Sequence, residues 1–114
     1  GMQLRDFVYV KDVVKAMIAL VELNDPKASG IYNLGTGKAR SFNDLTIATF
    51  KAMGKDPQID YIDMPESIRN QYQYFTEADM EKLKKVLPEF KFSSLEEGVG
   101  DYVKNYLLKE NIFH

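Results

Sequence analysis

The 114-residue chain contains no cysteine and no tryptophan, and its single histidine, His114, is the last residue. The absence of cysteine excludes disulfide scaffolds, thiol catalysis and cysteine-based zinc sites, and it agrees with a cytoplasmic location. One terminal histidine argues against histidine-based catalysis and against metal sites built from several histidines. We therefore expect no bound metal in this chain.

Neither sign of charge dominates, because 15 basic residues stand against 17 acidic ones, for a net charge of −2. This balance argues against non-specific binding to nucleic acid. No apolar run is long enough to cross a membrane, and the first residues lack the apolar segment of a secretory signal. The hydrophobic fraction of 45%, with seven Phe and seven Tyr, excludes disorder of the whole chain and is typical of one globular domain.

Four segments have the apolar spacing and the capping residues of helices, and they alternate with short strand-like runs. The predicted helices run from Asp12 to Pro26, from Ser41 to Gly54, from Thr76 to Pro88 and from Ser94 to Leu107. The predicted strands are Phe7–Val10, Ile31–Leu34 and Gln58–Ile62, and residues 64–75 form a loop. The alternation predicts an α/β fold.

Gly35-Thr36-Gly37 follows a predicted strand and precedes a helix that Ser41 can cap. The dinucleotide fingerprint needs a third glycine three positions later, where this chain has Arg40. A tight turn is therefore the simpler interpretation. The alternative is anion binding by the loop N–H groups, with Lys38 and Arg40 nearby.

Two other motifs are candidates for binding. Arg5-Asp6 stands directly before an apolar run, where an arginine can bind phosphate through two N–H groups or can form a surface ion pair. Residues 69–75 combine one arginine with three amides and three aromatic side chains on a predicted loop. Such loops suit sugars and nucleotide bases, although two of the aromatics could equally pin the loop to the core.

The segments Arg5–Val13 and Gly30–Gly37 together resemble the C-terminal part of the extended short-chain dehydrogenase/reductase family, which acts on nucleotide-diphosphate sugars. The resemblance extends through Ala39–Phe42, Gln58–Ile62 and Tyr72–Asp79 to Glu97–Val99, and so covers nearly the whole chain. Within the family it is strongest to members that act on ADP-heptose.

The resemblance implies that the complete protein is an epimerase that binds NADP or NAD on a Rossmann domain and inverts C6 of the heptose, for lipopolysaccharide synthesis. It also implies substrate-binding roles for Arg5, near the diphosphate, and for Tyr72. The catalytic Tyr-x-x-x-Lys of the family is absent, because no tyrosine of this chain has a lysine four positions later.

We therefore predict that residues 1–114 are a single C-terminal substrate-binding domain fragment without its Rossmann domain, and that Gly1-Met2 is not native sequence. We assign it no catalytic or cofactor-binding residue, expect it to be inactive alone, and expect the unpaired edge of the predicted strand at Tyr32–Leu34 to promote self-association. Two alternatives stay open: the same portion of another nucleotide-sugar epimerase or dehydratase, and a non-catalytic interaction module.

Overall fold

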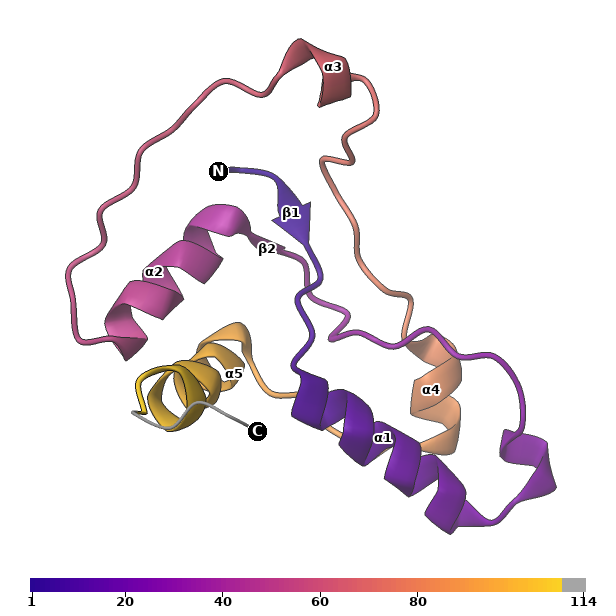
Figure 1. Ribbon diagram of the computed structural model, residues 1–114. Coiled ribbons are helices and arrows are strands. Elements are labelled where there is room, and N and C mark those ends of the chain that lie inside the picture. Colours follow the sequence, from indigo (N-terminus) through magenta and orange to yellow (C-terminus); the bar gives the residue numbers. More distant parts are fainter. Residues whose placement is uncertain (110–114) are drawn as a thin grey trace.

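The computed structural model describes residues 1–109 as helices arranged around one small antiparallel sheet (Figure 1). The sheet consists of β1 (Leu4–Arg5) and β2 (Arg40–Ser41). The helices are α1 (Val10–Leu23), the 3-10 turn η1 (Pro26–Ala28), α2 (Phe42–Ala52), α3 (Glu66–Arg69), α4 (Glu81–Val86), α5 (Leu95–Tyr102) and the π-helical turn η2 (Val103–Leu107). The α/β class is thus confirmed. Among residues 1–109, no helix has the length and apolar character needed to span a membrane.

β1 brings distant parts of the chain together although it is only two residues long. On one side, Leu4 faces Ser41 and Arg5 faces Arg40 in the antiparallel ladder. On the other side, the Leu4 N–H donates to the carbonyl of Tyr74 at 2.8 Å, and the Thr76 N–H donates to the carbonyl of Leu4 at 3.1 Å. The segment after residue 70 is therefore held beside Arg5.

α2 and α5 pack against each other, and both begin at the predicted caps. Ser41 and Asp44 form a complete capping box, as do Ser94 and Glu97. Each box satisfies N–H groups that a helix start would otherwise leave unpaired. The buried apolar residues of the described chain are mostly small or medium: Ala16, Ala48, Met80, Leu83, Leu95 and Val103.

The two glycines of α5 have different structural roles. A Cβ on Gly98 would lie 3.2 Å from the Cβ of Tyr9, whereas a Cβ on Gly100 would meet no atom within 4 Å. Gly98 therefore allows the segment before α1 to approach α5 closely. Gly100 only weakens the helix.

We expect Gly100→Ala to raise the free energy of unfolding by about 0.5–1 kcal/mol, because alanine is the better helix former. Gly98→Ala makes the same chemical change in the same helix and is its matched comparison. Its gain in propensity is offset by the contact with Tyr9. Urea unfolding of both variants tests this difference. An equal gain in both would show that Gly98 is not needed for close approach.

The three predicted strands were wrong, although the fold does contain short strands. Residues 7–9 are extended without a partner strand, and Val10 already belongs to α1. Residues 31–34 and 58–62 also lack a ladder partner within the described chain. Period-two alternation favours extended backbone, but a strand needs a neighbour for its N–H and C=O groups. The edge predicted at Tyr32–Leu34 is therefore not a sheet edge.

Two helix starts and one loop also differ from the prediction. α1 begins at Val10 with Tyr9 as its N-cap, and Asp12 does not cap it. Asp12 is buried instead, and its carboxylate accepts hydrogen bonds from the N–H and the hydroxyl of Ser93. The third predicted helix begins only at Glu81, because Thr76 is paired with β1. α3 lies within the predicted loop.

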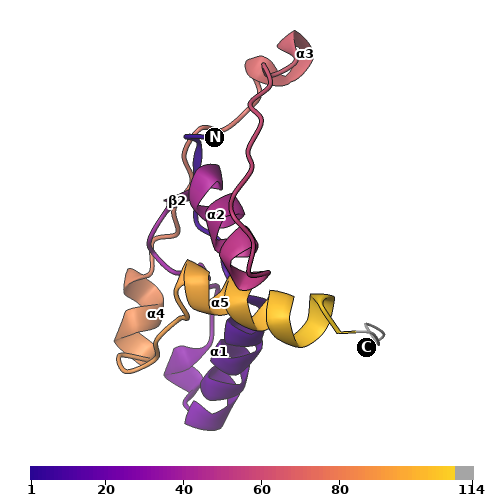
Figure 2. The same ribbon diagram turned by 90° about the vertical axis from the view of Figure 1, so that its left-hand side faces the viewer.

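The molecule is thin and open for its length. Its radius of gyration is 17.0 Å, against about 13 Å expected for a compact domain of this size. The long segments that lead to and from α3 reach away from the helices, as the view in Figure 2 shows. No large side chain among the described residues is fully buried. The chain therefore has little core to hold its outer segments.

Candidate functional site

The Gly35–Gly37 loop holds an anion, and that anion is the carboxylate of Asp6. The N–H groups of Thr36 and Gly37 donate to Asp6 at 2.9 Å each, and the Thr36 hydroxyl donates at 2.5 Å. The N–H of Ala78 donates to the same carboxylate at 3.1 Å. Burial raises the pKa of Asp6, but these hydrogen bonds outweigh the burial and lower it below its usual value. The two sequence motifs are thus parts of one internal contact.

Arg5 does not pair with Asp6, and its guanidinium lies between aromatic rings. Its central carbon is 5.0 Å from the ring centre of Tyr72 and 6.0 Å from that of Phe42. One N–H group donates to the carbonyl of Leu4 at 3.0 Å. No carboxylate among residues 1–109 forms an ion pair with Arg5. Its charge is therefore held in a fixed place and is available to an anion.

The structure brings the two predicted site residues, Arg5 and Tyr72, into direct contact. Tyr72 lines an open cavity of about 300 Å³, large enough for part of a small ligand. On the wall of this cavity, the Tyr61 hydroxyl donates a hydrogen bond to the side-chain oxygen of Asn43 at 2.9 Å. The other residues that line it are Gly1, Gln3, Phe42, Thr46, Ile59, Asp60 and Ile62. The cavity thus adjoins the Arg5–Tyr72 contact and offers aromatic rings and an amide, although Arg5 itself does not line it.

A second polar cluster joins the start of α1 to the end of α5. The Tyr9 hydroxyl and the Lys11 ammonium both donate to the carboxylate of Asp101, the latter at 2.9 Å. Burial and the Asp101 charge raise the pKa of Tyr9 to about 12, and the hydrogen bond from Tyr9 helps lower that of Asp101 to about 2. A phenol with so high a pKa stays protonated near neutral pH. It is therefore a structural donor and not a proton acceptor.

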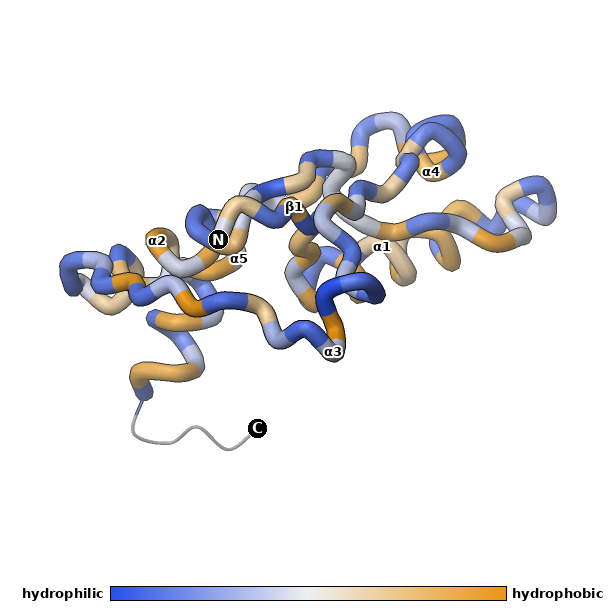
Figure 3. Tube along the Cα trace, turned by 90° about the horizontal axis from the view of Figure 1, so that it is seen from above, coloured by the Kyte–Doolittle hydropathy of each residue, from blue (hydrophilic) through white to orange (hydrophobic). Residues whose placement is uncertain are grey.

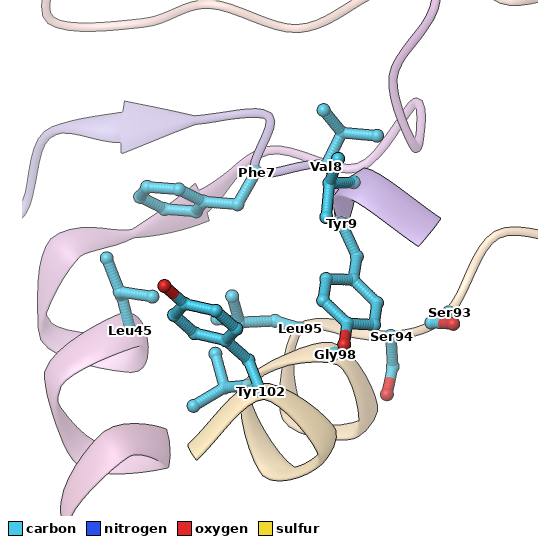
Figure 4. Close-up of a pocket in the computed structure, with 11 residues that line it drawn as sticks. Phe7, Val8, Tyr9, Leu45, Ser93, Ser94, Leu95, Gly98 and Tyr102 are labelled. Carbon is cyan, nitrogen blue, oxygen red and sulfur yellow. The ribbon is translucent and has the colours of Figure 1, made fainter. Parts of the chain in front are cut away.

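An apolar cavity of about 330 Å³ lies between α2, α5 and residues 7–10, as Figure 4 shows. Phe7, Leu45, Leu95 and Tyr102 point into it. No charged side chain lines it, and the hydroxyls of Ser93 and Ser94 are already used by Asp12 and by the α5 cap. This cavity has no group that could bind a phosphate.

A third cavity, of about 510 Å³, lies beside α4 and has basic residues around an apolar floor. Lys38, Lys84, Lys91 and Arg40 all line it. Arg40, however, is paired with Asp44 and, through two N–H groups, with Glu96. The side chains of the three lysines are not held in place as the Arg5 guanidinium is. The Arg5–Tyr72 site is therefore the stronger candidate for binding an anion.

Sequence reasoning missed Phe42 and the cavity residues Asn43 and Tyr61. Phe42 follows Ser41, which pairs with β1, and that register places its ring beside Arg5. The pairing of two-residue strands leaves no periodic signal in the sequence. Residues 1–109 contain no group of three or more acidic, histidine or cysteine side chains arranged to hold a metal. His114 lies outside the described residues.

Comparison with known proteins found a family model and several relatives that match this chain. The model of the NAD dependent epimerase/dehydratase family matches residues 1–35, which include Arg5, Asp6 and Gly35. An ADP-L-glycero-D-manno-heptose-6-epimerase of Nitratidesulfovibrio vulgaris strain DP4 is 50% identical over 113 residues, covering 99% of this chain and 34% of that protein.

Two further relatives carry the same name. The protein of Nitratidesulfovibrio vulgaris strain Hildenborough is 52% identical over 107 residues, covering 94% of this chain and 32% of its own length. That of Fusobacterium nucleatum is 53% identical over 119 aligned positions, covering 99% of this chain and 35% of its own length. The chain is thus homologous to ADP-L-glycero-D-manno-heptose-6-epimerases, and it spans about a third of the length of these relatives.

Proposed function

We propose that this chain is the C-terminal, substrate-binding portion of an epimerase that inverts C6 of ADP-D-glycero-D-manno-heptose in the bacterial cytoplasm, for the inner core of lipopolysaccharide. The observation that carries the proposal is the identity of 50–53% to three ADP-heptose epimerases along nearly the whole chain. In the longer protein, a nicotinamide cofactor (NADP or NAD) would supply the redox chemistry of this inversion, which involves no net redox change.

The role of this chain in that reaction is to hold the substrate. Arg5 is suited to the diphosphate because its charge has no carboxylate partner in the described chain and its guanidinium lies over the ring of Tyr72. The ring of Tyr72 and the Asn43–Tyr61 pair offer stacking and hydrogen-bonding surfaces for the rest of the nucleotide sugar. The cavity is open, so the site needs a second wall from elsewhere in the protein to bury its ligand.

The described residues do not fit the nicotinamide cofactor itself. A dinucleotide site needs free loop N–H groups that point at the pyrophosphate. In the Gly35–Gly37 loop these groups already donate to Asp6. The Tyr9 phenol is not a proton acceptor either, because its pKa is raised and not lowered. We therefore place cofactor and catalytic residues in the remaining two thirds of the longer protein.

The test compares nucleotide sugars. We expect the longer protein to prefer ADP-heptose to UDP- and dTDP-sugars by at least about tenfold in affinity, measured by calorimetry. The 114-residue chain should bind ADP-heptose weakly and should not invert C6 in a turnover assay, since it lacks the second wall and the cofactor. Equal affinity for all three nucleotide sugars would favour another nucleotide-sugar enzyme. Turnover by the 114-residue chain alone would refute the proposal that the cofactor and the catalytic residues lie elsewhere in the longer protein.

A further inference from the structure

Asp6 joins the two parts of the chain that supply the rings around Arg5. Its carboxylate accepts hydrogen bonds from the Gly35–Gly37 loop, which leads into β2 and Phe42, and from the segment that follows Tyr72. Phe42 and Tyr72 are the two rings that lie beside the Arg5 guanidinium. Asp6 directly follows Arg5, and Figure 3 shows β1 in the middle of the molecule, between α2 and α4. One carboxylate therefore links both rings to the strand that carries the cation.

The loop and the segment that carries Ala78 approach each other closely at Gly35. Gly35 is buried, and a Cβ there would lie 2.6 Å from Oδ2 of Asp6 and 2.8 Å from the Cβ of Ala78. Both distances are too short for a Cβ, so only glycine fits while Asp6 keeps its hydrogen bonds. Beside this contact, the Ala39 N–H donates to the carboxylate of Glu77 at 2.8 Å. The loop and the segment are thus held together at two neighbouring points.

The backbone ladder alone gives the two rings little support. β1 and β2 are two residues long each, and even a longer two-stranded ladder is only marginally stable by itself. The hydrogen bonds to Asp6 involve a charged acceptor, which makes each of them about twice as strong as a neutral one. Asp6 therefore contributes more than the ladder does to the positions of Phe42 and Tyr72 relative to Arg5.

We propose that Asp6 is a positioning residue for the nucleotide sugar. By holding the loop to the segment that follows Tyr72, it keeps the Arg5 guanidinium between its two rings, where it can bind the diphosphate. The oxygens of Asp6 already accept four internal hydrogen bonds, so Asp6 acts through Arg5 and not on the ligand. This proposal rests on the proposed function, because it needs Arg5 to bind the nucleotide sugar.

Thr36→Val tests the proposal more cleanly than Asp6→Asn, which is expected to destabilise the whole chain. It removes the hydroxyl that donates to Asp6 at 2.5 Å and keeps the backbone N–H groups. In the longer protein, we expect the KM for ADP-heptose to rise about three- to tenfold and kcat to stay within about twofold, because Arg5 contacts a part of the substrate that does not react. Thr49→Val is the matched control and should change neither, since the Thr49 hydroxyl donates to the Leu45 carbonyl within α2.

A double-mutant cycle separates positioning of Arg5 from a general loss of structure. In an Arg5→Ala background, Thr36→Val should raise KM by less than about twofold, because no guanidinium is left to position. Gly35→Ala, which pushes the loop away from Asp6, should behave as Thr36→Val does. Gly100→Ala is its control, because a Cβ there meets no atom within 4 Å. An equal rise in KM with and without Arg5 would overturn the proposal, as would an unchanged KM in both Thr36→Val and Gly35→Ala.

The Arg5 side chain also reports on its position without any ligand. In NMR spectra of the 114-residue chain, the ring of Tyr72 should shift the Nε–H proton of Arg5 upfield, and Thr36→Val should reduce that shift. Failure of the unaltered longer protein to bind ADP-heptose would count against the proposed function. Normal binding of ADP-heptose, together with an unchanged Arg5 signal in Thr36→Val, would instead overturn the positioning role of Asp6.

Discussion

Replacing Asp6 by asparagine is expected to destabilise the chain by about 3 kcal/mol, the largest stability effect of any single polar change that we foresee. The Asp6 carboxylate accepts four hydrogen bonds, two from Thr36 and one each from Gly37 and Ala78. An asparagine would turn an NH2 group toward N–H donors, leaving at least one of them unpaired. Urea unfolding measures the loss, with Asp56→Asn, an exposed position, as the control.

The same contact predicts a dependence on pH. Because the folded-state pKa of Asp6 lies below the unfolded value of 3.8, its contribution is complete above about pH 4 and is lost as the pH falls through the folded pKa. The difference in stability between the native chain and Asp6→Asn should therefore shrink on acidification below pH 4. A difference that is small at neutral pH, or that grows in acid, would show that the loop does not depend on this carboxylate.

Replacing Arg5 by alanine is expected to weaken binding of ADP-heptose by about 10- to 100-fold, which corresponds to one charge-assisted hydrogen bond. The Arg5→Lys variant keeps the charge but loses the guanidinium group that lies over the Tyr72 ring, and it should bind ADP-heptose with intermediate affinity. Tyr72→Phe should bind nearly normally if the ring, and not the hydroxyl, supplies the contact. Isothermal titration measures each affinity.

Arg69→Ala is the matched control, because it removes the same charge from the end of α3. The Arg69 guanidinium donates to the carbonyl of Met64 on the α3 side and does not contact Tyr72 through any described interaction. Equal losses from Arg5→Ala and Arg69→Ala would reduce the effect to general electrostatics. A loss of affinity for ADP-heptose in Arg5→Ala but not in Arg69→Ala supports a specific binding site at Arg5.

The helices and their caps could be predicted from the sequence where the signal is local. Ser41 with Asp44 and Ser94 with Glu97 form the boxes that the spacing indicates, because a cap involves only four consecutive residues. The end of α1 before Pro26 was also predicted, and Asn24 there adopts a left-handed conformation. Asp12 misled the prediction, since a carboxylate near a helix start can equally serve a distant donor, here Ser93.

The strands and most of the site depend on partners far away in the sequence. Phe7–Val10 has the β-branched and aromatic residues typical of a strand, but no partner strand pairs with it in the described chain. The resemblance to a family pointed to Arg5 and Tyr72. In the structure, the guanidinium carbon of Arg5 lies 5.0 Å from the ring centre of Tyr72. That the Gly35–Gly37 loop is closed by Asp6, 30 residues earlier, follows only from the fold. Their roles in binding stay predictions.

The central claim is that this chain holds the nucleotide sugar and leaves the cofactor to another part of the protein. Chemical-shift mapping by NMR tests it most directly, with ADP-heptose and NADP⁺ added separately to the 114-residue chain. We predict that ADP-heptose shifts the amide signals of Arg5 and Tyr72 and that NADP⁺ shifts none. Saturable binding of NADP⁺, or ADP-heptose shifts confined to the cavity around Lys38, Lys84 and Lys91, would contradict the claim.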